Sequence, residues 1–291
     1  MRPFDVKLLV AVTFMSVLVA ASGVAQAPAF LVKDITDAPV PISLQSAESV
    51  TIGATTFFLA STRATGRELW KTDGSEAGGA LVKDIRPGSG SAFSSAAAEF
   101  ANVNGTLLFT ATDGTHGREL WKSDGTEAGT VLVKDINPGP GDSSAQGLTS
   151  VNGTLFFTAD DGVNGPELWK SDGTEAGTVL VKDINPGPGD SSAQGLTSVN
   201  GTLFFTADDG VTGTELWKSD GTEGGTVLVK DIYPGDGSSD PYDLTNVNGT
   251  LFFTADDGVA GTELWKSDGT EAGTVLGKTL PPAPGTRTSG L

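Results

Sequence analysis

The chain has 291 residues, of which 40 are Gly and 15 are Pro, and its net charge is −18. This charge excludes a basic surface for nucleic acid, and a charged fraction of only 19% excludes a long charged helix or coiled coil. Cys is absent and His116 is the single His, which excludes disulfides, zinc–thiolate sites, iron–sulfur clusters and multi-histidine metal sites. The many turn-forming residues indicate short strands separated by tight turns.

The N-terminal segment has the layout of a secretory signal peptide. Arg2 and Lys7 flank the start of an apolar run from Leu8 to Ala21, and small residues follow. This run is shorter than the roughly 20 residues that span a bilayer. Cleavage after Ala25 is preferred to cleavage after Ala27, because Pro28 would constrain the second bond. We predict a signal peptide at 1–25, with an uncleaved signal anchor as the alternative, and no membrane span after its removal.

The rest of the chain is a tandem repeat. Residues 119–163 and 167–211 are identical over 45 positions. The Trp residues recur at spacings of 51, 48, 48 and 48, at positions 70, 121, 169, 217 and 265. Self-similarity at this period is typical of propellers and linear arrays.

One repeat unit divides into four short strands, and none of it has a sustained helical period. The expected strands are 148–151, 154–159, 166–171 and 178–184. Asn152-Gly153 predicts a two-residue type I′ turn, because both residues accept positive φ. In the second strand Leu155 and Phe157 share one face and Phe156 the other. A link of about eleven residues, 185–195, follows the fourth strand.

A four-stranded sheet with apolar residues on both faces is not stable alone. Stacking such sheets face to face covers both faces, and a ring removes exposed ends. The sequence therefore predicts an all-β fold: a β-propeller-like ring of about five four-stranded antiparallel blades within residues 26–280. An open linear stack is the alternative, and residues 281–291 are predicted to be a disordered tail.

The two ends of the array suggest how it closes. Residues 30–35 copy the fourth strand, but no first three strands precede them. Residues 274–280 are a worn fourth strand that lacks the Asp-Ile pair. We expect strand 30–35 to complete the sheet of the last unit, with the final copy displaced or weakly paired. The alternative is that the chain is a piece of a larger ring.

The motif Glu-Leu-Trp-Lys-Ser-Asp-Gly-Thr at 167–174, with Leu-Val-Lys-Asp-Ile at 180–184, resembles the bacterial ELWxxDGT repeat family. The resemblance covers about 230 residues in five copies. The first copy departs from the motif at Ser75 and Gly79, and the last at 277–279. The resemblance implies an exported protein with propeller-like repeats, and it implies no defined activity.

Acidic residues recur in register and form candidate calcium sites. Calcium prefers carboxylate and carbonyl oxygens, which Asp-Gly turns provide. The candidate ligands are Asp160, Asp161, Asp172, Glu175, Asp208, Asp209, Asp220 and Glu223. The alternative is turn chemistry, in which Asp side chains accept hydrogen bonds from nearby backbone N–H groups. Calcium is the one candidate cofactor.

Other polar residues are interpreted structurally. We expect Lys170 and Lys182 to form cross-strand ion pairs with Glu167 and Asp183. His116 lies at a turn position occupied elsewhere by Asn164, Thr212 and Ala260, which indicates a turn residue. No catalytic residues are identified, because repetition places each carboxylate in five similar environments, whereas an acid–base pair needs two different ones.

These observations favour a non-enzymatic repeat protein, secreted or at the cell surface, with the periplasm as another compartment. Its repeated loops would bind an extracellular protein or glycan, in adhesion or in a matrix. The alternatives are a glycan- or peptide-directed hydrolase of propeller fold and a structural spacer without a ligand. A loose likeness of residues 171–174 to the Asp-box turn of propeller hydrolases is the support for the hydrolase.

Overall fold

The computed structural model describes residues 49–75, 79–94 and 99–278. This part of the chain is all-β and contains no helix. The first two sheets contain β1 (Ser49–Ile52), β2 (Thr55–Thr62), β3 (Gly66–Thr72), β4 (Ala80–Lys83), β5 (Phe100–Val103), β6 (Thr106–Ala111), β7 (Glu119–Ser123) and β8 (Val131–Lys134). The other three contain β9 (Gln146–Val151), β10 (Thr154–Asp160), β11 (Pro166–Ser171), β12 (Val179–Lys182), β13 (Gln194–Val199), β14 (Thr202–Asp208), β15 (Thr214–Ser219), β16 (Val227–Lys230), β17 (Tyr242–Val247), β18 (Thr250–Asp256), β19 (Thr262–Ser267) and β20 (Val275–Lys278).

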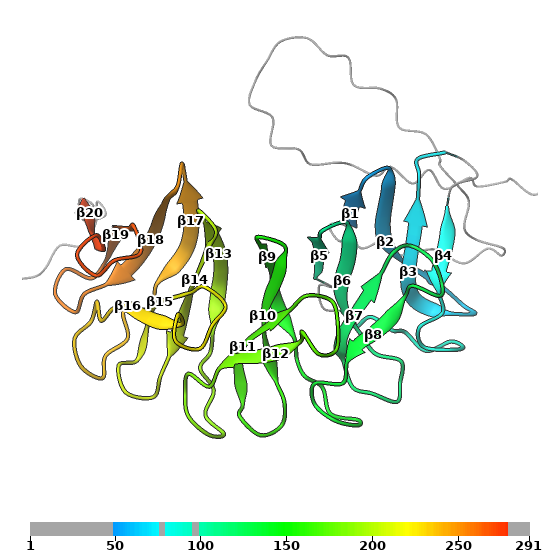
Figure 1. Ribbon diagram of the computed structural model, residues 1–291, viewed down its shortest axis with the longest axis horizontal. Helices are drawn as coiled ribbons and strands as arrows, with labels where there is room; N and C mark the ends of the chain where they lie inside the picture. Colours follow the sequence, from blue (N-terminus) through cyan, green and yellow to red (C-terminus); the bar gives the residue numbers. More distant parts are fainter. Residues whose placement is uncertain (1–48, 76–78, 95–98, 279–291) are drawn as a thin grey trace, which may run out of the picture.

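Each sheet is an antiparallel meander of four consecutive strands, which we call a blade. The first to fifth blades are β1–β4, β5–β8, β9–β12, β13–β16 and β17–β20. They follow one another along an arc, with the first strand of each blade on the inner side (Figure 1). These inner strands contact one another in sequence from β1 to β17. The predicted all-β, propeller-like arrangement of five four-stranded antiparallel blades is confirmed.

Local sequence explains the tight first turn of a blade. Asn152 and Gly153 have φ values of 51° and 78°, as a type I′ turn requires, and they join Val151 to Thr154 in register. The same geometry recurs at Asn104, Asn200 and Asn248. Because this turn matches the twist of the strands, it sets which residues of the blade face each neighbour.

The core lies between blades, as the alternation of apolar residues predicts. In the third blade, Leu155, Phe157 and Trp169 pack against the second blade. Phe156 and Leu168 lie on the opposite face and pack against the fourth blade. Full burial of such a side chain stabilises the fold by roughly 1.5–3 kcal/mol. Each blade therefore buries both of its apolar faces against neighbouring blades.

The fourth strand of a unit is shorter than predicted. The sequence suggested 178–184, whereas β12 spans Val179–Lys182. Asp183 and Ile184 leave the sheet because the backbone N–H of Ile184 donates to the carboxylate of Glu167 at 3.0 Å.

The prediction that the final copy is displaced or weakly paired is wrong. β20 pairs with β19 through Leu264↔Lys278 and Trp265↔Leu276, in the register of the other fourth strands. The lost Asp-Ile pair lies beyond the strand in the other blades, so its loss does not affect the ladder. The predicted signal peptide at 1–25, the strand at 30–35 and the tail at 281–291 lie outside the described residues.

Candidate functional site

The loops of each blade gather at two edges, because its strands are antiparallel. The link edge carries the turn between the second and third strands, such as 161–165, and the long link to the next blade, such as 183–193. The turn edge carries the Asn-Gly turns and the turns between the third and fourth strands, such as 172–178. A Cβ on Gly165 would collide with the carbonyl of Gly189, so turn and link are in close contact at the link edge.

A buried glutamate holds the long link against the blade. Glu167 is fully buried, and its two carboxylate oxygens accept backbone hydrogen bonds from Ile184 and Asn185, each at 3.0 Å. Glu119 likewise accepts from Ile136 at 2.9 Å and from Ser143 at 3.0 Å. Sequence reasoning missed this role, although strand alternation already placed Glu167 on the same face as the buried Trp169.

The environment of these glutamates changes their ionisation. Burial raises the pKa of Glu68, Glu119 and Glu167 to about 7, and the backbone N–H donors oppose this rise. Such a shift can mark a catalytic acid, but structural networks produce it too. Here the carboxylate oxygens contact the protein's own backbone, so the contacts favour the structural explanation.

The eight candidate calcium ligands are divided between the two edges. Asp160, Asp161, Asp208 and Asp209 lie at the link edge, whereas Asp172, Glu175, Asp220 and Glu223 lie at the turn edge. The two sets of a blade are therefore not brought together. In the residues that the structure describes, no three His, Cys, Asp or Glu side chains form a group that could hold a metal ion.

The aspartates among these candidates serve as hydrogen-bond acceptors within their own turns. Asp161 Oδ1 accepts from the backbone N–H of Val163 at 2.9 Å and of Asn164 at 2.8 Å. Asp172 Oδ1 accepts from the Thr174 hydroxyl at 2.6 Å and from its N–H at 2.8 Å. These Thr174 donors hold the pKa of Asp172 below its usual value. The turn chemistry considered as the alternative to calcium is present.

The link-edge turns expose an apolar side chain at their tips. Val163, Val211 and Val259 are 70%, 72% and 91% exposed. Each follows Asp-Asp-Gly, and in each turn the second Asp accepts two backbone hydrogen bonds. Three consecutive blades therefore present the same internally hydrogen-bonded turn, in which one valine follows two aspartates.

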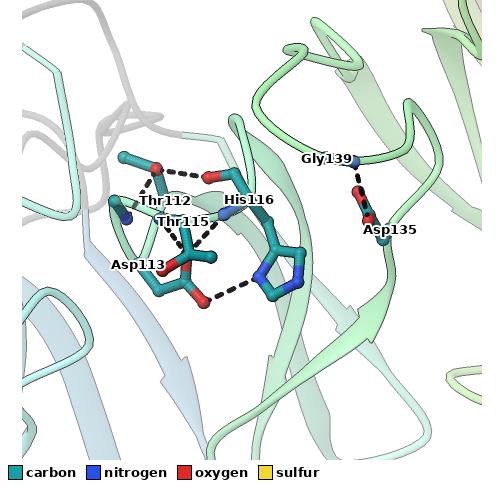
Figure 2. A network of polar contacts seen from close by, with 7 residues as sticks. Thr112, Asp113, Thr115, His116, Asp135 and Gly139 are labelled. Atoms are coloured by element: carbon teal, nitrogen blue, oxygen red, sulfur yellow. Dashed lines mark hydrogen bonds and ion pairs between the residues drawn. The ribbon is translucent and has the colours of Figure 1, made fainter.

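His116 occupies the same turn of the second blade (Figure 2). Its Nδ1 lies 2.8 Å from Asp113 Oδ2, and its backbone N–H donates to Asp113 Oδ1 at 2.8 Å. The hydrogen bond to Asp113 raises the pKa of His116. In the third blade Asn164 makes the equivalent contact to Asp161, so His116 has the same structural role as an uncharged residue.

The recurring lysines do not form the expected ion pairs. Lys170 Nζ donates to the carbonyl of Gly221 at 2.7 Å, and Lys182 Nζ to that of Thr226 at 3.0 Å. Both acceptors belong to the next blade, and Lys182 Nζ lies 5.7 Å from the ring centroid of Trp217. The prediction of pairs with Glu167 and Asp183 is wrong, because these side chains extend across the junction between blades instead of along their own sheet.

A small cavity of about 160 Å³ lies between the fourth and fifth blades, near Lys218, Phe204 and Asp268. Typical ligand pockets measure about 300–1,000 Å³, so this cavity is too small for most organic ligands. Among the described residues there is no helix that is long and apolar enough to cross a membrane. Because the cavity is so small, the exposed loops of the link edge are stronger candidates for recognition than the cavity.

Comparison with known proteins reveals a likeness in fold. No protein-family model and no curated protein matches the chain. A solved puromycin hydrolase variant complexed with PGG matches with a TM-score of 0.51 and 16% identity. A puromycin-hydrolyzing peptidase from Mycobacterium tuberculosis matches with a TM-score of 0.46 and 13% identity over 81% of this chain and 39% of that one. The first match covers 82% of this chain but only 38% of the hydrolase, and at this identity it shows the fold alone.

Proposed function

We propose that this chain is an exported, non-enzymatic repeat protein that binds an extracellular protein or glycan through the turns of its link edge. The observation that carries the proposal is the repeated Asp-Asp-Gly-Val turn, with Val163, Val211 and Val259 exposed in successive blades. An internally hydrogen-bonded turn loses little conformational entropy on binding, and an exposed apolar residue that follows two aspartates offers both contact area and polar recognition. Adhesion at the cell surface or in a matrix is the role that fits such a surface.

Repetition suggests that binding is multivalent. When equivalent sites engage one extended partner, the second contact is intramolecular and raises the overall affinity without a new kind of contact. The strongly acidic chain favours partners with basic or hydroxyl-rich surfaces. This preference agrees with the proposal of a protein or glycan ligand.

Binding of the labelled mature chain to immobilised glycans, to basic peptides and to intact bacteria tests the proposal. Val163→Asp, Val211→Asp and Val259→Asp, introduced one after another, should weaken binding stepwise. Glu175→Gln, Glu223→Gln and Glu271→Gln at the turn edge are the matched control and should leave it unchanged. No binding to any panel would support a spacer instead, and turnover of a glycan or peptide substrate by the purified chain would support a hydrolase.

Export requires a separate test. Mass spectrometry of the protein recovered outside the cytoplasm should find a mature chain that begins at Gln26. A full-length chain retained in the membrane fraction would favour the uncleaved signal anchor, and a full-length chain in the cytoplasm would contradict export.

A further inference from the structure

The four junctions between blades have the same polarity. At each junction a lysine side chain of the earlier blade donates to a backbone carbonyl of the later one. At the fourth junction Asn246 Nδ2 also donates in the other direction, to the carbonyl of Ser198 at 2.9 Å. At the second junction Lys122 Nζ donates to the carbonyl of Gly173 at 2.8 Å, and Asn104 Nδ2 donates to that of Gly153 at 3.1 Å. The equivalent lysine bonds at the other three junctions are Lys71 to Gly125, Lys170 to Gly221 and Lys218 to Gly269. The two faces of a blade are therefore different halves of one interface.

A phenylalanine completes the donor half at three of these junctions. A Cβ built on Gly221 would lie 3.1 Å from Cζ of Phe156. The same arrangement joins Gly125 to Phe57 and Gly269 to Phe204. The aromatic ring of the earlier blade thus lies directly against the glycine of the later blade's Asp-Gly turn.

Within the part of the chain that the structure describes, no later blade covers the donor half of the fifth blade, and we call this half the tail face. Val247 is 46% exposed, whereas its counterpart Val199 in the fourth blade is 4% exposed. Phe252 and Leu264 are half-buried, although their counterparts in the fourth blade are buried. Lys266, the counterpart of Lys218, is exposed.

The first blade presents the matching acceptor half, which we call the head face. Phe58 is half-buried, whereas its counterparts Phe109, Phe157 and Phe205 are fully buried. Gly74 is exposed, whereas its counterparts Gly125, Gly173 and Gly221 are buried. Thr56, itself half-buried, stands where Leu155 is fully buried at the second junction.

The two end blades also differ in charge. Residues 49–83 contain four basic and three acidic residues, whereas residues 242–278 contain two basic and six acidic residues. The end blades lie at opposite ends of the arc (Figure 1), so the head face of a chain is not in contact with its own tail face. Lys71 and Lys83 of the first blade donate to carbonyls of the second blade, so this charge difference belongs to the whole blades and not to the head face. Docking is therefore supported by the equivalence of the two faces to the halves of an internal junction.

We propose that the tail face of one copy docks on the head face of a second copy and reproduces an internal junction. Phe252 would lie against Gly74, Lys266 Nζ would donate to the carbonyl of Gly74, and Asn248 would donate to that of Ala54. This interface is heterologous, so copies add head to tail until a ring closes or a filament grows. The inference concerns self-association and does not depend on the ligand proposed above.

Sedimentation velocity of the mature chain over a range of concentrations tests the inference. The wild-type chain should form oligomers whose mean mass rises with concentration. Val247→Asp would bury a carboxylate in the tail face, and Thr56→Glu would do so in the head face, so each variant should be monomeric. Both positions are partly exposed in the free chain, so each variant should keep the circular dichroism spectrum of the wild type.

A mixture of the two variants identifies the polarity of the interface. Thr56→Glu keeps an intact tail face and Val247→Asp an intact head face, so an equimolar mixture should form a dimer that grows no further. Glu175→Gln, at an exposed turn-edge position of the third blade, is the control and should associate like the wild type. The proposal is overturned by a wild type that stays monomeric at every concentration, by variants that still associate alone, or by a mixture that stays monomeric.

Discussion

The fourth and fifth blades are built from nearly the same sequence, yet their outer faces differ in burial. Phe204 and Val199 are 3% and 4% exposed beneath the fifth blade. Phe252 is half-buried at the same position, and Val247 is 46% exposed. The strand pairing is the same in both blades, so the neighbouring blade, and not the blade's own sequence, decides whether these residues belong to a core.

The largest expected effect tests this difference directly. Phe204→Ala should lower the free energy of unfolding by about 3–5 kcal/mol, because it leaves a cavity in a packed junction. Phe252→Ala should cost less than half as much, because solvent already reaches that side chain. Urea denaturation of both variants on the Val247→Asp background, where self-association is suppressed, provides the measurement. Equal losses would show that the blade is stabilised mainly from within.

The second prediction compares a buried glutamate inside a blade with an exposed glutamate at its turn edge. Glu167→Ala should cost about 2–5 kcal/mol, because two buried N–H groups, of Ile184 and Asn185, lose their acceptors. Glu175→Ala, at the exposed turn edge, should change stability by less than about 0.5 kcal/mol. Denaturation midpoints of the two variants measure the difference. A small effect at Glu167 would mean that water replaces the carboxylate.

The third prediction concerns pH and separates the same two regions. The pKa of Glu68, Glu119 and Glu167 rises from 4.5 to about 7 on folding. The folded chain therefore binds more protons than the unfolded chain in this window, so stability is fully present below it and falls as pH rises through it. The turn-edge aspartates, such as Asp172 with its lowered pKa, have the opposite effect on the pH dependence of stability. Their contribution to stability is lost only as the pH falls into the acid range.

Urea midpoints at about pH 5 and about pH 8 measure this effect, which amounts to roughly 1.4 kcal/mol for each pKa unit of a group. Glu119→Gln should reduce the fall in stability between the two conditions. Asp172→Asn at the turn edge should not change it, because the lowered pKa of Asp172 keeps its titration below this window. An unaltered fall in Glu119→Gln would assign the pH dependence to other groups.

A smaller effect is expected for the lysines that cross junctions. Lys218→Met removes the hydrogen bond to the carbonyl of Gly269 and should cost about 1 kcal/mol. Lys266→Met, at the same position of the fifth blade, should be nearly neutral on the Val247→Asp background. Thermal unfolding of the two variants provides the comparison. Equal effects would indicate that the aliphatic stem of the lysine, and not the contact with the next blade, stabilises the chain.

The smallest effect is expected for calcium. Because the turn aspartates already accept hydrogen bonds from their own backbone, we expect the same melting temperature with calcium and with EDTA. A higher melting temperature with calcium would revive the proposed ligands, and Asp161→Asn and Asp172→Asn would then locate the site at the link edge or the turn edge.

The arrangement of a blade followed from local rules. Asn152-Gly153 determines a type I′ turn, and the alternation of Leu155, Phe156 and Phe157 assigns two apolar faces, whatever lies beside them. The five copies of the repeat then predict five similar sheets, which the structure contains. The pairing of the last strand differs from the prediction, because backbone hydrogen bonds form the ladder and the missing Asp-Ile pair lies beyond it.

The amino-acid sequence by itself determined the strands, the turns and the need of each sheet for a neighbour, because these depend on residues close together in the chain. Only the tertiary structure decided the partners of polar side chains. Glu167 holds a link 17 residues away, and Lys170 reaches a carbonyl 51 residues away. It also decided that the calcium candidates of one blade lie at opposite edges and that Phe252, unlike Phe204, is incompletely covered. Burial and hydrogen bonding are properties of surroundings, and those surroundings come from other blades.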